Sequence, residues 1–149
     1  MMQYNRLYIN YIYILLNVVC SQVNDNPPTF EYKNYATGVS ENDELRKILL
    51  TLFASDPDLD DKITYFLLYD TIKITGNNLN DVKDTPFIVN KDTGVLLLNF
   101  KPKALMKGFF EFEVEARDLV NHTDNAAVKI YLISDGMLFY CLVSLCHGN

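Results

Sequence analysis

The segment FEFEVEARD, residues 110–118, constrains the fold of this chain more than any other stretch. Phe110, Phe112, Val114 and Ala116 alternate with charged residues along it. A period of two places one set of side chains in a core and the other set in solvent. We therefore predict a β-strand here, with the acidic side chains on its solvated face.

Six further runs have the composition of strands, and no long window has the periodicity of a helix. With the first, the predicted strands cover residues 36–40, 47–54, 63–69, 86–90, 95–100, 110–118 and 126–134. Polar or glycine-bearing breaks separate most of them. Seven short strands predict an all-β chain, a seven-strand Greek-key sandwich of the immunoglobulin type.

Length, charge and cysteine content narrow the function. The chain has 149 residues, 49% of them hydrophobic, which suits one domain with one core. Its formal charge of -6 and its lack of a Lys or Arg cluster exclude a nucleic-acid partner and favour a cationic one. The three cysteines, Cys20, Cys141 and Cys146, lie outside the patterned region and predict neither a metal pair nor a disulfide framework.

The two ends of the chain differ from its middle. Residues 1–22 hold Arg6, then an apolar stretch over residues 7–19, then Cys20 and Ser21, which is the layout of a secretory signal peptide. The competing interpretation is a mis-assigned gene end, and it applies equally to the tail, residues 136–149. The apolar run in that tail, residues 137–145, is shorter than the roughly 20 residues of a membrane-spanning helix.

Acidic and amide side chains gather at the ends of the predicted strands. Asp56 and Asp58 flank Pro57, Asp118 ends the alternating strand, and Glu41 follows residues 36–40. Several strand ends meet at each pole of a sandwich. Such oxygens, together with the run Asn24, Asp25 and Asn26, are the ligands that Ca²⁺ requires. The alternative for each carboxylate alone is a solvated loop residue.

Five short motifs in order give these acids a family context. They are VNDNPPTF at residues 23–30, SEN around Glu41, DPD at 56–58, DTG at 92–94 and VEARD at 114–118. Together they resemble the calcium-binding linker and the extracellular repeat of the cadherin superfamily, over residues 23–135. The resemblance implies four segments: a flank at 1–22, a linker at 23–30, a repeat at 31–135 and a tail at 136–149.

The resemblance also implies a role for each ligand. One calcium site would use the Asn24 side chain, the Asn26 carbonyl and three carboxylates, those of Asp56, Asp58 and Asp118. Asp25 and Asp58 would serve neighbouring sites completed by a preceding repeat. Calcium would then relieve the repulsion among the carboxylates and stiffen the junction between tandem repeats.

Two departures from the family pattern limit this assignment. Gln22 stands where the linker motif has its first aspartate, and the Asp-Arg-Glu motif expected after the DTG turn is absent. That region carries Lys101, Lys103 and Lys107, which cannot ligate calcium. Glu41 is then the one family ligand at the far pole, and we predict a calcium-free junction there. Such departures resemble membrane-proximal repeats of long, tip-link-type cadherins.

The resemblance implies an adhesive function at the cell surface. The expected partners are neighbouring repeats and a cadherin on an apposed cell, bound homophilically or heterophilically, with membrane attachment through a parent protein. In an extracellular chain, Asn121 in the triplet NHT would be an N-glycosylation site. His122 and His147 are isolated in sequence and are predicted to be surface histidines.

Two alternative functions have to be weighed against the calcium module. DTG is also the signature of aspartic proteases, but that mechanism needs a second carboxylate beside Asp92, and the chain has no second copy of the triplet. We therefore predict that the chain is not an enzyme. A metal-free sandwich that binds proteins is the other alternative, and Asp56→Asn with Asp58→Asn would separate it from a calcium module.

Overall fold

The structure is a computed structural model that describes residues 24–58, 62–79, 82 and 85–133. The described part holds nine strands and no helix, so the predicted all-β fold class is confirmed. The strands are β1 (Thr29–Phe30), β2 (Asn34–Ser40), β3 (Ile48–Thr51), β4 (Ala54–Ser55), β5 (Thr64–Asn77), β6 (Phe87–Val89), β7 (Val95–Leu98), β8 (Lys107–Arg117) and β9 (Thr123–Ile133). The predicted signal peptide, Gln22, His147 and the tail lie outside the described residues.

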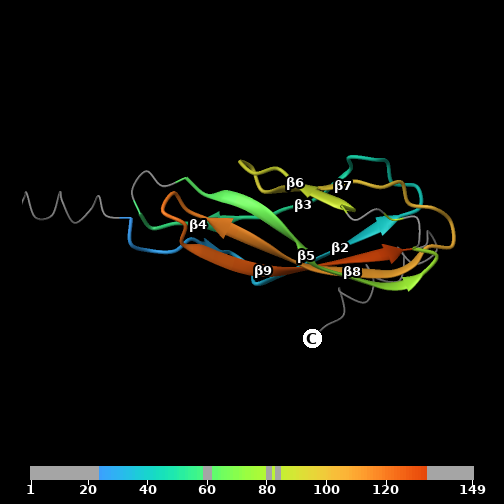
Figure 1. Cartoon of the computed structure of the whole chain (residues 1–149). Coiled ribbons are helices and arrows are strands. Elements are labelled where there is room, and N and C mark those ends of the chain that lie inside the picture. Colours follow the sequence, from blue (N-terminus) through green and yellow to red (C-terminus); the bar gives the residue numbers. More distant parts are fainter. Residues whose placement is uncertain (1–23, 59–61, 80–81, 83–84, 134–149) are drawn as a thin grey trace, which may run out of the picture.

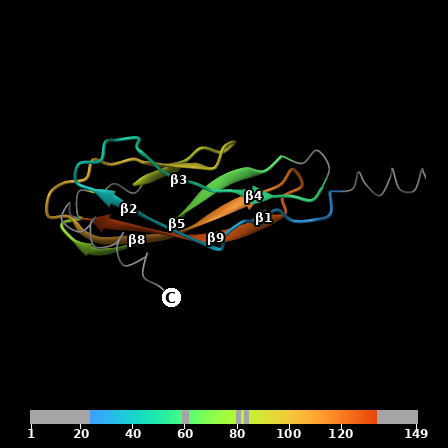
Figure 2. The same ribbon diagram turned by 180° about the vertical axis from the view of Figure 1, so that it is seen from behind.

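The strands form two facing layers. One sheet has the order β2-β9-β8-β5, the other has the order β3-β7-β6, and β1 pairs with β4 beside them. Figure 1 shows β3, β6 and β7 on one side of the molecule and β5, β8 and β9 on the other, and Figure 2 shows the same layers from behind. Both sheets bury one face in the space between them, as expected for a sandwich.

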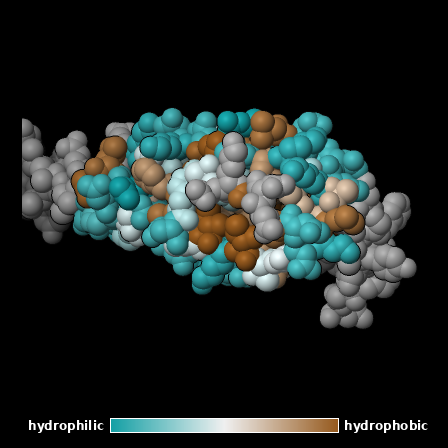
Figure 3. Space-filling view, turned by 45° about the vertical axis from the view of Figure 1, so that its right-hand side comes forward, coloured by the Kyte–Doolittle hydropathy of each residue, from teal (hydrophilic) through white to brown (hydrophobic). Residues whose placement is uncertain are grey.

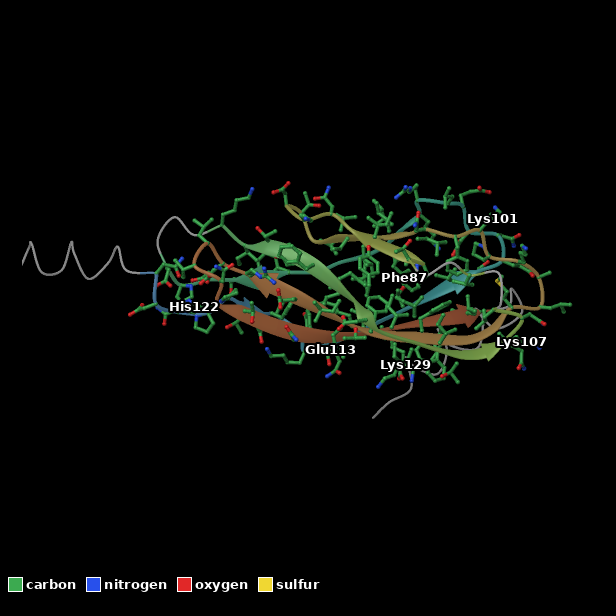
Figure 4. The ribbon with its side chains drawn as sticks, viewed as in Figure 1. Phe87, Lys101, Lys107, Glu113, His122 and Lys129 are labelled. Atoms are coloured by element: carbon green, nitrogen blue, oxygen red, sulfur yellow. The ribbon has the colours of Figure 1, made fainter. Side chains whose placement is uncertain are left out.

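Strand β2 lies parallel to β9, from Asn34 opposite Ala127 to Ser40 opposite Ile133. The linker therefore joins the molecule at one end, and β9 finishes at the other. We call the end with residues 24–28, 56–58 and 118–122 the N-terminal pole. The end with residues 41–47 and 99–107 is the C-terminal pole. Figure 4 places His122 at the first end, with Lys101 and Lys107 at the other.

The alternating strand buries its apolar side chains as predicted. Phe110, Phe112, Val114 and Ala116 are at most 3% exposed. Phe87 of β6 enters the same core from the opposite sheet, where Figure 4 labels it. Its ring centroid lies 5.1 Å from those of both Phe110 and Phe112. This aromatic cluster holds the two sheets together.

Several strands differ in extent from the sequence prediction; β2, β8 and β9 each begin two or three residues earlier than predicted, at Asn34, Lys107 and Thr123. β5 continues to Asn77, beyond the predicted end at residue 69, because its second half pairs with the start of β8. The predicted run 47–54 divides into β3 and β4, and β4 pairs with the short β1, for which no separate strand was predicted. Each difference arises from pairing with a distant strand rather than from local periodicity.

Strands β5 and β8 approach unusually closely near the C-terminal pole. Gly76 and Gly108 lie opposite each other with φ of 150° and 135°, a backbone region that suits glycine. A Cβ built on Gly108 would overlap Thr75 O and come within 2.6 Å of the Gly76 Cα. The two glycines therefore fix where the ends of these strands lie.

The first strand is held to β9 by Asp124. This carboxylate accepts a hydrogen bond of 2.8 Å from the Phe30 N–H and forms an ion pair with Lys33, and its side chain is only 20% exposed. Burial raises the pKa of Asp124, but hydrogen bonds from Lys33 and Phe30 outweigh it and leave the pKa below its usual value. The ionised form is therefore favoured by folding.

We expect Asp124→Asn to lower the free energy of unfolding by about 1–2 kcal/mol at neutral pH, because a charge-assisted contact is lost. A depressed pKa contributes stability above the unfolded value, near 3.9, and loses it as the pH falls through the folded value. Urea unfolding at pH 7 and at pH 3 measures this. The variant should differ from the parent chain mainly at pH 7, and an equal difference at both pH values would contradict the assignment.

Candidate metal site

The linker enters the N-terminal pole beside Asp58. The Asn26 N–H donates to Asp58 Oδ2 at 2.8 Å, and Asn26 Nδ2 donates to Asp58 Oδ1 at 2.8 Å and to Asp25 Oδ1 at 2.9 Å. Pro27 and Pro28 follow and offer no further N–H groups. One amide group thus bridges two carboxylates that would otherwise repel each other.

Asp56 lies just inside this pair. Pro57 prevents β4 from continuing, and the Asp58 N–H donates a hydrogen bond of 2.9 Å to Asp56 Oδ1, two residues earlier in the chain. Asp56 Oδ2 is buried and has no hydrogen-bond partner among the described residues, and Asn24 Oδ1 is buried too. A buried carboxylate oxygen without a donor costs free energy, which a bound cation would recover.

Asp118 lies at the start of the β8–β9 hairpin and is the third acidic segment of the N-terminal pole. Its side chain is 0% exposed, and its Oδ1 accepts from the Val120 N–H at 2.9 Å and the His122 N–H at 2.7 Å. Its Oδ2 lies 2.8 Å from His122 Nδ1. The hairpin of residues 118–122 is thereby shaped around one buried carboxylate.

Hydrogen bonds at the pole favour the ionised form of Asp58. Hydrogen bonds from the Asn26 side chain and backbone hold the pKa of Asp58 below its usual value, and the charge of His122 acts in the same direction. Asp58 therefore stays an anionic oxygen donor well below neutral pH. That is the state in which carboxylates bind hard cations.

The structure thus brings six of the seven candidate ligands to one pole. These are Asn24, Asp25, Asn26, Asp56, Asp58 and Asp118. Glu41 lies at the opposite pole, as predicted, beside a pocket that includes Lys103 and Lys107.

His122 is the residue at this pole that the sequence did not reveal. Its side chain is 42% exposed, in agreement with the predicted surface position, but its ring also contacts Asp118. Its position four residues after Asp118 was the available signal. Asn121, the candidate glycosylation site, is exposed beside it with φ of 72°.

The side-chain oxygens at the N-terminal pole are of the kind that binds a hard cation, although in this structure several of them accept hydrogen bonds from N–H groups. In the described part of the chain, no three acidic, histidine or cysteine side chains converge on one point as a metal cage would require. The oxygens of Asp25, Asp58 and Asp118 are instead engaged by Asn26 and His122. The buried Asp56 Oδ2, which has no hydrogen-bond partner among the described residues, is the observation that favours a cation.

Lysines neutralise the acids at the C-terminal pole. Lys47 Nζ lies 2.7 Å from Asp43 Oδ1, and Lys101 Nζ lies 2.8 Å from Glu44 Oε1. Two carboxylates near Glu41 therefore already have a cationic partner from the same chain. This pairing supports the prediction of a calcium-free junction at this pole.

The triplet at 92–94 forms a turn. Asn90 Oδ1 accepts hydrogen bonds from the N–H groups of Asp92 and Thr93, both at 3.0 Å. The Asp92 side chain is 68% exposed and pairs with Lys62 at 2.7 Å. An exposed carboxylate paired with lysine lacks the second carboxylate that a protease dyad requires.

The amino-acid sequence of the chain is similar to the sequences of known cadherins. The chain is 33% identical over 123 residues to Cadherin-AgCad1 of Anopheles gambiae, covering 82% of this chain and 7% of that protein. It is 34% identical over 122 residues to human Protocadherin gamma-C4, covering 80% of this chain and 12% of that protein. Human Cadherin-23 is 28% identical over 123 residues, covering 80% of this chain and 4% of its own length. The chain thus spans a small fraction of these relatives, and no family model matches it.

Solved structures support the fold. Protocadherin Gamma B7 extracellular cadherin domains 1-4 match 76% of this chain and 25% of that chain, with a TM-score of 0.59 and 21% identity. Mouse Cadherin-23 EC22-24 matches 74% of this chain and 33% of that chain, with a TM-score of 0.60 and 21% identity. These neighbours are extracellular β-sandwich domains of the immunoglobulin-like kind. Among the described residues, no helix is long and apolar enough to cross a membrane.

Proposed function

Because this chain contains an extracellular repeat of the cadherin superfamily, we propose that it is a calcium-dependent cell-cell adhesion module whose N-terminal pole binds calcium. Members of this family are adhesion proteins and not enzymes, so the protease alternative is dropped. The single observation that carries the metal proposal is the buried Asp56 Oδ2, which lacks a hydrogen-bond partner among the described residues.

The proposed ligands lie on three segments that are far apart in sequence. Asn24 and Asn26 come from the linker, Asp56 and Asp58 follow β4, and Asp118 begins the β8–β9 hairpin. Asp25 and Asp58 would also serve sites shared with a preceding repeat. Glu41 remains a proposed ligand at the C-terminal pole, where the pairing of Asp43 and Glu44 with lysines favours weak binding or none.

The mechanism is a stiffening of the linker. Calcium supplies a divalent charge that attracts several carboxylates at once. Without it, the Asn26 amide alone bridges Asp25 and Asp58. The linker is then joined to Asp58 by two exposed hydrogen bonds, from the N–H and the side-chain amide of Asn26, and these hold it weakly because water competes for both partners. Held by a cation, the linker would orient a preceding repeat along the same axis, and tandem repeats would form a rod.

The cellular setting follows from the family. We propose an extracellular location at the plasma membrane within a longer parent protein. Its partners would be adjacent repeats and a cadherin on an apposed cell, homophilic or heterophilic. Asn121 would carry an N-linked glycan at the exposed tip of the hairpin. A membrane-proximal place in a long, tip-link-type cadherin is also proposed.

Calcium should stabilise the chain through this pole. A ligand that binds only the folded state, present at 100 times its Kd, adds about 2.7 kcal/mol. We expect millimolar calcium to raise the melting temperature relative to chelator, and Asp56→Asn to remove most of that rise. Isothermal titration calorimetry and thermal melting, with and without calcium, measure both effects.

Asp92→Asn is the matched control, because it removes one exposed carboxylate that pairs with Lys62 and is not a proposed ligand. It should keep the calcium response of the parent chain. If calcium produced no heat and no change in melting, or if both variants lost the response equally, the proposed site would be rejected. A metal-free protein-binding sandwich would then be the better description.

A further inference from the structure

The outer face of the four-stranded sheet has a hollow that involves neither pole. Its volume is about 520 Å³, within the range of about 300–1,000 Å³ that small-molecule sites occupy. Phe112 and Val128 point into the core, so their neighbours along β8 and β9 face the opposite side of the sheet. Figure 4 labels Glu113 and Lys129 on that side, away from Phe87. We call this region the sheet hollow, and it lies over Asn34, Ala36, Lys73, Glu113, Ala127 and Lys129.

Two alanines form the floor of the sheet hollow. Ala127 of β9 lies between Asn34 of β2 and Glu113 of β8, and Ala36 of β2 lies opposite Lys129. Both alanines are exposed. A methyl group rises much less above a sheet than the longer side chains around it, so the space over the two alanines stays open.

Lys129 does not close this space, because its amine is held elsewhere. Its Nζ lies 2.7 Å from Glu111 Oε1 and 3.9 Å from the centre of the Phe109 ring. Phe109 lies opposite Tyr131 in the next row of the sheet, toward the C-terminal pole. The ion pair and the cation–π contact therefore keep the lysine amine away from Ala127.

A bulge in β5 forms one wall of the sheet hollow. The register between β5 and β8 shifts between Leu68 and Lys73. Inside the bulge, the Thr71 hydroxyl donates to Leu68 O at 2.6 Å and accepts from the Glu113 N–H at 2.9 Å. These two hydrogen bonds fix the wall to its neighbours, so a ligand would not have to order it on binding.

The polar side chains of the sheet hollow offer donors and acceptors without net charge. Two lysines and two glutamates line it, namely Lys73, Lys129, Glu111 and Glu113. The side chains of Asn34 and Lys73 make no hydrogen bond or ion pair with another described residue. The Glu113 carboxylate accepts from Asn125 Nδ2 at 3.2 Å and has further lone pairs to accept with. The hollow thus holds unused donors beside an unused acceptor.

An exposed aromatic ring lies in the row next to the sheet hollow. Tyr131 is 44% exposed, and its ring centre lies 6.2 Å from that of Phe109 and 5.4 Å from Lys129 Nζ. Figure 3 shows that hydrophilic residues cover most of the surface in view. A ring of this exposure is therefore a localised apolar feature, placed beside a polar hollow.

We propose that the sheet hollow binds a neutral oligosaccharide. Sugar hydroxyls both donate and accept hydrogen bonds, so they satisfy the Glu113 carboxylate as well as the side chains of Asn34 and Lys73. The C–H faces of the sugar rings rest on the two alanine methyl groups and against Tyr131, because an aromatic ring presents a negative face to weakly positive C–H groups.

Other ligand classes fit the sheet hollow less well. An anionic ligand would meet the carboxylates of Glu111 and Glu113 as well as the two lysines. A peptide that adds a strand needs an unpaired sheet edge, whereas β8 and β9 below the hollow are paired on both sides. An apolar ligand would find only the two methyl groups of the floor.

This proposal does not depend on the proposed metal site. None of the residues of the sheet hollow is a proposed calcium ligand. Sugar binding should therefore be the same in calcium and in chelator.

An NMR titration of the isotope-labelled full chain tests the proposal. The neutral probes are mannotriose and lacto-N-tetraose, and sialyllactose is the acidic comparison. At millimolar concentration, at least one neutral probe should shift the backbone amides of residues 34–36, 71–73, 111–113 and 127–129. Sialyllactose should shift them less.

Filling the hollow should abolish these shifts. Ala127→Leu places a larger side chain over the floor at an exposed position of β9, so the fold and the melting temperature should be kept. Ala104→Leu is the matched control, because it makes the same change at an exposed alanine that does not line the hollow. It should bind like the parent chain.

Removing one donor should weaken binding in part. Lys73→Ala should raise the Kd of the neutral probe by about threefold to tenfold, the usual effect of one lost hydrogen bond. Lys107→Ala removes an exposed lysine of the same sheet outside the hollow and should leave the Kd unchanged.

Several results would overturn the proposal. They are no response to either neutral probe, stronger binding of sialyllactose, shifts confined to other parts of the chain, and equal losses in Ala127→Leu and Ala104→Leu. If the sugar response is as expected but calcium neither binds nor stabilises the chain, the sheet hollow stands as a sugar site and the proposed metal site fails.

Discussion

Replacing Phe87 by alanine should lower the free energy of unfolding by about 3–5 kcal/mol, the largest effect that we expect from a single substitution. Phe87 is 0% exposed, and its ring packs against those of Phe100, Phe110 and Phe112. Alanine would leave a cavity between the two sheets that neighbouring rings cannot fill without leaving their rotamers. Urea unfolding at neutral pH measures the loss.

Phe53→Ala is the control for this prediction. Phe53 is 57% exposed, so its removal should change the free energy of unfolding by less than about 0.5 kcal/mol. A comparable loss in both variants would mean that the aromatic cluster does not join the sheets. An unchanged m-value would show that the variant still unfolds in one transition.

Gly108→Ala should destabilise the fold by about 2–3 kcal/mol. Its φ of 135° strains any side chain, and the added Cβ would overlap the backbone of β5 at Thr75 and Gly76. Backbone atoms cannot turn aside as a side chain can, so the two strands would have to separate near the C-terminal pole. Chemical unfolding gives the stability, and hydrogen exchange at the ends of β5 and β8 should rise locally.

Gly38→Ala separates this clash from the general cost of replacing glycine. A Cβ at Gly38 would overlap only side-chain atoms of Ile133, with Tyr131 O at an ordinary contact distance of 3.8 Å, and Gly38 is not among the residues with positive φ. It should cost less than about 1 kcal/mol. Equal losses for the two variants would contradict the close approach of β5 and β8.

The sequence predicted the fold wherever one residue pattern is enough to define an element. The alternation from Phe110 to Ala116 identified both the strand and its buried face. It did not predict that the Glu115 side chain, which pairs with Arg117, would be only 14% exposed. The second half of β5 was missed although Ile72 and Ile74 alternate with polar residues; it continues as a strand because Lys73 to Asn77 pair with the start of β8.

The candidate site was predictable as a set of residues but not as an arrangement. Acids at strand ends indicated that Asp56, Asp58 and Asp118 would share a pole. Nothing in the local sequence indicates that the Asn26 amide bridges Asp25 and Asp58, because Asn26 and Asp58 are 32 positions apart. The local sequence likewise does not indicate the contact of Asp124 with the first strand, because its hydrogen bond from the Phe30 N–H joins residues 94 positions apart.

The parallel pairing of β2 and β9 has a mechanical consequence. The chain enters beside the start of β2 and leaves at the end of β9, so tension between its ends pulls these neighbours in opposite directions along their length. All seven residue pairs between Asn34 and Ser40 then resist the load together, in shear, instead of opening one after another. A domain anchored in this way transmits force along its long axis, and its weakest direction lies across the sheets rather than between its ends.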